Sequence, residues 1–199
     1  MKNTYRTINR NSEYLLKESQ SKFFGYAFPV LNTEVIKNRI YKLKTSHNTA
    51  GHFCYAYQIG ITDITYRSND DGEPRNSAGL PIYGQIQSFD LTNILIVVVR
   101  YFGGIKLVVG GLISAYKKCS KETIEANKII TKSIIIPIHI KFNYPQMNSV
   151  MRIIKEYHLE IENKEMHTVC VFEILTTMKN NAAVSIIFKR HPYIELVEN

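Results

Sequence analysis

Hydrophobic and polar positions alternate with a period of two in one stretch of the N-terminal half. Phe53, Tyr55, Tyr57 and Ile59 are separated by a cysteine, an alanine and a glutamine. Successive side chains of a strand point to opposite faces of a sheet. The pattern therefore predicts a strand over His52–Ile61 with one aromatic face.

Two further segments of the same half have the character of strands. Ile94–Arg100 (ILIVVVR) is a continuous apolar run, which is typical of a central strand covered on both faces. Lys22–Val30 (KFFGYAFPV) is aromatic and bounded by polar residues, and it predicts a second strand. A return strand is expected from Ile64, after a turn at Thr62–Asp63.

Helical spacing predicts three helices in this half. The first follows the potential capping residues Asn32 and Thr33, and its apolar positions recur every three to four residues. Pro81–Ser88 predicts a short helix, because proline suits the first helical position. The third helix is expected over about Gly111–Asn127, with an apolar inner stripe.

The C-terminal part has a different order of elements, β-α-β-β-α-β. This order within about 65 residues is that of the split-βαβ or ferredoxin-like arrangement. The predicted strands are Ile134–Phe142, Leu159–Lys164, Thr168–Thr177 and Tyr193–Val197, and the predicted helices are Pro145–Tyr157 and Asn180–Lys189.

Charge is divided unevenly between the two parts. The chain of 199 residues has 25 Lys+Arg and 17 Asp+Glu, a net charge of +8. Residues 1–131 hold 17 of these basic residues and 10 of the acids, net +7, whereas residues 132–199 hold 8 and 7, net +1. We therefore expect two domains, 1–131 and 132–199, and we expect the first to bind any anionic partner.

Cellular location is also constrained by the pattern. The first residues contain no apolar stretch of the kind found in signal peptides, and no run is long enough to span a bilayer. The three cysteines are odd in number and form no CxxC pair. We expect a reduced, cytoplasmic protein with no membrane partner.

The stretch RYFGGIKLVVGGLISAY, from Arg100 to Tyr116, has the strongest chemical character. Glycine pairs flank Ile105–Val109, and the second pair lies where a helix is expected to begin. Unpaired amides at a helix start, with nearby cations, favour a phosphate. The alternative is that the glycines only make tight turns. The candidate phosphate or nucleic-acid residues are Arg100, Gly103, Gly104, Lys106, Gly110, Gly111, Lys117 and Lys118.

An acidic loop precedes the short helix. Asp70, Asp71 and Glu73 could hold a divalent cation through oxygen ligands. The alternative is a turn whose acids pair with arginines, Arg100 among them, or accept backbone N–H groups.

His52 and Cys54 are expected on one face of a strand. They could form a Cys–His nucleophile pair. The alternative is a buried cysteine beside a histidine with a structural role, and no further metal ligands lie at the usual spacing.

Basic and aromatic residues also occur together. Lys37, Arg39, Lys42 and Lys44 lie in the first predicted helix, and the chain has 13 Tyr and 9 Phe. This combination suits RNA or single-stranded nucleic acid, where phosphate contacts and stacking dominate.

Three ordered motifs give the sequence a family resemblance. They are HFCYAY at His52–Tyr57, DDGEP at Asp70–Pro74 followed by Ala78-Gly79, and RYFGG at Arg100–Gly104 followed by KL, GGL and AY. On these motifs the chain resembles the IMPACT family, bacterial YigZ branch. It departs from the family pattern at Val108, where glycine is usual, and at Arg75-Asn76-Ser77.

The resemblance implies a mixed α/β (α+β) fold of two domains. The first would be an α/β sandwich like the second domain of the fifth small-subunit ribosomal protein. The second would be ferredoxin-like, similar to the fifth domain of elongation factor G. Eukaryotic relatives act in translational control, and both likenesses point toward RNA or ribosomes.

From residues and resemblance together we expect a non-enzymatic protein associated with RNA or the ribosome, with no cofactor, no resident metal and no catalytic residue. A metal-dependent phosphoester or nucleotide hydrolase using Asp70, Asp71 and Glu73 is one alternative. A protein-interaction module that acts on a translation-associated partner is another.

Overall fold

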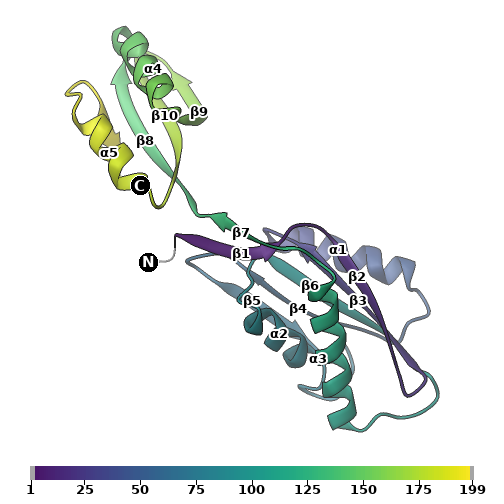
Figure 1. Cartoon of the computed structure of the whole chain (residues 1–199). Helices are drawn as coiled ribbons and strands as arrows, with labels where there is room; N and C mark the ends of the chain where they lie inside the picture. Colours follow the sequence, from purple (N-terminus) through teal and green to yellow (C-terminus); the bar gives the residue numbers. More distant parts are fainter. Residues whose placement is uncertain (1–2, 198–199) are drawn as a thin grey trace. The chain divides into compact units, whose positions relative to one another are not determined.

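The computed structural model describes residues 3–197, which form two compact units (Figure 1). Among the described residues, one unit is Tyr5–Lys132, and the other consists of Ser133–Val197 together with Asn3 and Thr4. The predicted domains 1–131 and 132–199 stay a prediction, because compactness does not show that either part folds alone.

The first unit is a mixed α/β structure. Its strands are β1 (Thr4–Ile8), β2 (Ser12–Glu18), β3 (Ser21–Pro29), β4 (His52–Ile59), β5 (Thr65–Asn69), β6 (Ile94–Tyr101) and β7 (Ile129–Ser133). Its helices are α1 (Thr33–Ser46), α2 (Gly79–Ser88) and α3 (Val109–Glu125). Strands β2 to β6 form one antiparallel sheet in the order β2-β3-β6-β4-β5, while β1 and β7 form a separate two-stranded sheet.

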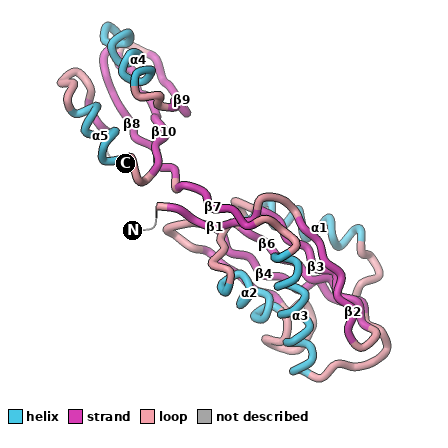
Figure 2. The backbone as a smooth tube through the Cα atoms, viewed as in Figure 1, coloured by secondary structure: helices cyan, strands magenta, loops and turns pink. Residues whose placement is uncertain are grey.

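Strand β6 is the middle of the five-stranded sheet and is covered on both faces, as its apolar run predicts. Ile94, Ile96 and Val98 belong to a core with residues of α2 and α3. The alternate residues Leu95 and Val97 belong to a second core with residues of α1. The unit therefore has three layers, with α1 on one face of the sheet and α2 and α3 on the other (Figure 2).

Helix α1 begins where its sequence predicts. The side chain of Asn32 accepts a hydrogen bond from the amide of Val35, at 2.9 Å, and so caps the helix. Ile36 and Leu43 are buried against the sheet, and Lys37 and Lys42 are exposed. The basic residues of this helix therefore lie on its outer side and edges.

Strands β1, β2 and β7 were not expected from the pattern. β2 is an edge strand, and its residues are mostly exposed or half-exposed. Only Leu16 of this strand is buried. Because β2 has so few buried apolar residues, its strand structure depends on its pairing with β3 and not on its own sequence pattern.

The second unit has the predicted order β-α-β-β-α-β. Its elements are β8 (Ile135–Asn143), a 3₁₀ turn (Tyr144–Gln146), α4 (Met147–Glu156), β9 (Glu160–Met166), β10 (Val169–Thr177), α5 (Asn181–Lys189) and β11 (Glu195–Val197). The strands pair antiparallel in the order β11-β8-β10-β9. Phe142, Phe172 and Phe188 lie in its core.

Candidate nucleic-acid interface

Arg100, the first residue of the predicted phosphate set, is inside the protein. It lies near the end of β6 and is only 5% exposed. Its Nη1 donates to Oε1 of Glu73 at 2.7 Å, and both side chains are almost fully buried. The charge of Arg100 is therefore balanced by a carboxylate of the acidic loop, and the guanidinium is not presented to a ligand.

A tyrosine and a cysteine complete this buried cluster. The hydroxyl of Tyr116 on α3 donates to the same Glu73 oxygen at 2.7 Å. Sγ of Cys54 lies 3.3 Å from that hydroxyl. Burial raises the pKa of both Tyr116 and Cys54 well above their ordinary values. The Cys54 thiol therefore stays protonated and is a weak nucleophile.

His52 does not activate Cys54. Nδ1 of His52 is 2.8 Å from the carbonyl oxygen of Asp71. Sγ of Cys54 instead contacts the carbonyl of Asp70, at 3.0 Å. Of the two interpretations that the sequence allowed, this geometry favours a buried cysteine beside a structural histidine.

The acids of the loop are occupied by internal donors. Oδ2 of Asp71 accepts the amide of Phe53 at 2.7 Å, and its Oδ1 is 3.6 Å from Nζ of Lys44. The carboxylate of Asp70 accepts the backbone amides of Asn76, Ala78 and Gly79. Within residues 3–197, no group of three or more His, Cys, Asp or Glu side chains is arranged to hold a metal ion.

The glycines after β6 have two different roles. A Cβ on Gly103 would lie 2.0 Å from the carbonyl oxygen of Gln20, so only glycine fits beside the β2–β3 turn. Gly104 has φ +89°, which glycine adopts easily. Gly110 and Gly111 are in the first turn of α3, where no such requirement exists.

The remaining predicted cations lie on the surface, in the loop before α3 and on that helix. Lys106 is exposed in the loop before α3, and Lys117 and Lys118 are exposed two turns into that helix. Val108 precedes the helix with φ −67°, which valine adopts without strain. The structure thus leaves an exposed helix start and exposed lysines, without Arg100.

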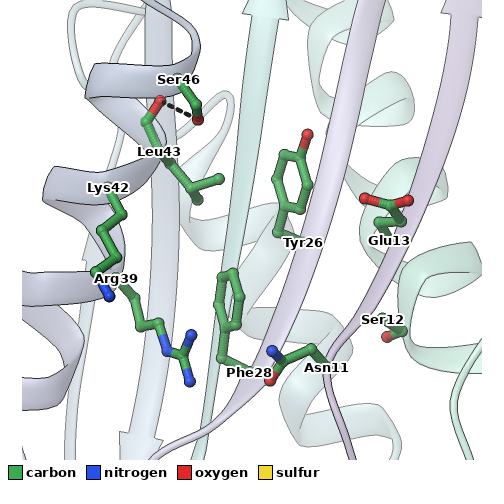
Figure 3. Close-up of a pocket in the computed structure, with 9 residues that line it drawn as sticks. All are labelled: Asn11, Ser12, Glu13, Tyr26, Phe28, Arg39, Lys42, Leu43 and Ser46. Atoms are coloured by element: carbon green, nitrogen blue, oxygen red, sulfur yellow. Dashed lines mark hydrogen bonds between the residues drawn. The ribbon is translucent and has the colours of Figure 1, made fainter.

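A groove of about 540 Å³ lies on the opposite face of the sheet, beside α1 (Figure 3). Tyr26 and Phe28 of β3 stand between α1 and the strand that carries Glu13. The guanidinium of Arg39 lies over the ring of Phe28, 5.0 Å from its centre. The lining residues are Asn11, Ser12, Glu13, Tyr26, Phe28, Arg39, Lys42, Leu43 and Ser46.

Two cations and one carboxylate set the charge of this groove. Arg39 and Lys42 carry positive charge on the side of α1, and Glu13 lies on the opposite side. Burial raises the pKa of Tyr26, helped by the nearby Glu13, so its hydroxyl stays neutral. This hydroxyl lies 2.7 Å from Nε2 of His47 and forms a hydrogen bond with it. The groove thus combines aromatic rings, a net positive charge and a neutral hydroxyl.

Sequence reasoning identified both halves of the groove without joining them. Arg39 and Lys42 belong to the predicted basic helix, and Tyr26 and Phe28 belong to the predicted aromatic strand Lys22–Val30. The period of two at Tyr26 and Phe28 predicts that they share a face. Which helix covers that face depends on tertiary structure.

Comparison with known proteins agrees with the three ordered motifs. The Impact N-terminal domain matches residues 19–124, which is more than half of the chain. The chain belongs to the IMPACT family. An IMPACT family relative, YvyE of Bacillus subtilis, is 32% identical over 84% of this chain and 76% of its own length. The IMPACT family member YigZ of Escherichia coli is 27% identical over 73% and 72%.

A solved structure has the same fold. The crystal structure of a hypothetical protein aligns with 100% of this chain and 98% of its own, with a TM-score of 0.80 at 21% identity. At this identity the likeness concerns the fold alone. None of the helices within residues 3–197 has the length and apolar character needed to cross a lipid bilayer.

Proposed function

We propose that this protein binds RNA through the groove beside α1 and thereby modulates translation. The observation that carries the proposal is the placement of Arg39 and Lys42 above a floor formed by Tyr26 and Phe28. The two cations can contact phosphates, and the half-buried ring of Tyr26 can stack with a base, while Phe28 supports Arg39 from below. These two terms dominate the binding of single-stranded nucleic acid.

Electrostatics support this choice of surface over the helix start of α3. Arg39 and Lys42 lie next to each other on one groove, whereas Arg100 is neutralised by Glu73. The structure describes every residue of α3, and none of its exposed positions carries an aromatic ring. That helix therefore offers charge without stacking.

The translational context comes from the family. Eukaryotic members act in translational control, as the resemblance implies, and an RNA-binding surface is compatible with that role. We further propose that the two units are domains, and that the C-terminal one orients the protein on its target or docks it there. This assignment rests on fold analogy.

The first experiment measures binding of a fluorescein-labelled oligouridylate of about eight nucleotides to the full chain. With about three phosphates contacted, affinity should fall roughly tenfold or more between about 50 and about 200 mM salt. The Arg39→Gln, Lys42→Gln double variant should bind about tenfold more weakly than the parent.

A matched control uses the other basic surface. Lys117→Gln with Lys118→Gln removes the same charge from α3 and should change affinity by less than about twofold. Absence of binding at low salt would overturn the proposal. So would an equal loss in both double variants, which would indicate attraction by net charge alone. Association with ribosomes that persists after RNase treatment, in a variant that binds no RNA, would identify a protein partner instead.

A further inference from the structure

We infer that the groove beside α1 is the first of two adjoining base-binding subsites, which together hold an unpaired RNA segment. This inference rests on the proposed function and adds how the RNA lies on the surface. The second subsite is formed by residues of β3, β6 and the loop that follows β6.

Strand β3 supplies a row of rings on the α1 face. Phe24, Tyr26 and Phe28 alternate with residues that face α3, so they are spaced about 6.8 Å apart along the strand. The rings of Tyr26 and Phe28 are nearly parallel, with centres 6.4 Å apart and an interplanar angle of 10°. Phe28 is only 8% exposed and lies beneath Arg39, so the half-buried rings of Phe24 and Tyr26 are the ones that this strand offers to successive bases.

A second hollow, of about 300 Å³, continues this row. Its volume is at the lower end of sites for small molecules, about 300 to 1,000 Å³. Phe102 is 59% exposed there, and the ring of Tyr101 packs edge-on against Phe24 with centres 5.7 Å apart. The lining residues are Gln20, Lys22, Phe24, His47, Tyr101 and Phe102.

His47 joins the two hollows. Its Nε2 is 2.7 Å from the hydroxyl of Tyr26, which lines the first, and its Nδ1 is 2.9 Å from the hydroxyl of Tyr101, which lines the second. Burial lowers the pKa of His47, so the ring is neutral near pH 7 and bonds both hydroxyls. The histidine thereby links a tyrosine ring of one hollow to a tyrosine ring of the other.

Charge complementarity selects the occupant. Arg39 and Lys42 lie at the first hollow and Lys22 at the second, so each subsite has at least one cation for a phosphate. A base that stacks on these rings must be free of its Watson–Crick partner. The surface therefore favours single-stranded over double-stranded RNA.

This placement gives the RYFGG motif a second role. Arg100 turns into the protein toward Glu73, while Tyr101 and Phe102 line the second hollow. Gly103 lets the chain pass close to the turn that ends at Gln20, another lining residue. The motif thus contributes its rings, rather than its arginine, to the RNA surface.

The experiment compares oligouridylates of about two, four and eight nucleotides on the full chain. For the parent protein, affinity should rise as the strand becomes long enough to reach the second hollow. Phe102→Ala should remove about fivefold or more of the affinity for the longer strands and leave the dinucleotide unchanged. Lys22→Gln should act in the same direction.

A matched control tests an exposed ring on the other face. Tyr66 of β5 is 57% exposed and stacks on Tyr83 of α2, so Tyr66→Ala should leave all three affinities unchanged. Suppose that Phe102→Ala and Lys22→Gln each bind oligouridylates of every length as the parent does, while the Arg39→Gln, Lys42→Gln double variant binds weakly. The second subsite is then refuted, and the groove beside α1 remains as the binding site. If the parent binds no RNA, both proposals fail. Equal affinity for a duplex of the same length would also refute the second subsite.

Discussion

The two faces of the five-stranded sheet use charge in opposite ways. On the α2 and α3 side, Arg100 and Glu73 are buried and paired with each other. On the α1 side, Arg39 and Lys42 border an open groove, and the only carboxylate among its lining residues is Glu13, across from them. The difference shows that a cation within a recognisable motif can serve the fold, whereas cations outside any motif remain available to a ligand.

The largest effect should come from breaking the buried pair. Arg100→Met leaves the Glu73 carboxylate uncompensated in the interior and should lower the free energy of unfolding of the first unit by about 3–5 kcal/mol. Hydrogen exchange of the β6 amides measures this loss, because central strands exchange through unfolding of the whole unit.

Arg39→Met is the matched control for that measurement. Arg39 lies at the groove and stacks on Phe28, so its loss should cost less than about 1 kcal/mol. Adding Glu73→Gln to Arg100→Met should recover part of the stability, since the unpaired charge disappears. Equal costs for Arg100→Met and Arg39→Met would contradict the contrast between the faces.

A smaller effect of opposite sign is expected at the groove carboxylate. Glu13→Gln removes repulsion between Glu13 and a bound phosphate and should strengthen oligouridylate binding about two- to fivefold. Glu18 is on the same strand, but the alternation of side chains places it on the α3 face of the sheet. Glu18→Gln should therefore have almost no effect on binding. Weaker binding by Glu13→Gln would mean that the carboxylate itself accepts hydrogen bonds from the RNA.

The smallest effect concerns pH. Burial lowers the pKa of His47 below 6.5, so below about pH 6.5 the unfolded chain takes up a proton that the folded chain resists. Stability should therefore rise with pH from the folded-state pKa to about 6.5. His47→Gln should flatten this slope in β6 hydrogen exchange, while His167→Gln, at an exposed position of the other unit, should not. An unchanged slope in His47→Gln would show that His47 takes up its proton equally in both states.

Strong periodicity explains most of what could be predicted about the fold. The apolar run at Ile94–Arg100 identified the central strand, and the element order of the second unit followed from successive amphipathic segments. β2 escaped prediction because an edge strand with one buried residue has little hydrophobic signal. The exact start of α3 differs by two residues, a common uncertainty at helix ends.

The candidate site was harder to predict, because it depends on pairings between distant residues. Glu73 is 27 residues from Arg100 in the chain. The sequence predicts an ion pair between the acidic loop and Arg100 as one alternative. The local pattern of residues cannot decide between that pair and an exposed Arg100 that binds a ligand. The groove likewise needs α1 and β3 to lie side by side, and His47 to reach two tyrosines from different strands.

The shared oxygen of Glu73 has a consequence for how related chains diverge. It accepts from both Arg100 and Tyr116, which come from the central strand and from α3. An apolar residue at any one of these three positions removes a hydrogen-bond partner from a buried polar group, so tolerated changes are expected to occur together. In IMPACT sequences these positions should covary as a set, whereas residues lining the groove are free to change with whatever each protein binds.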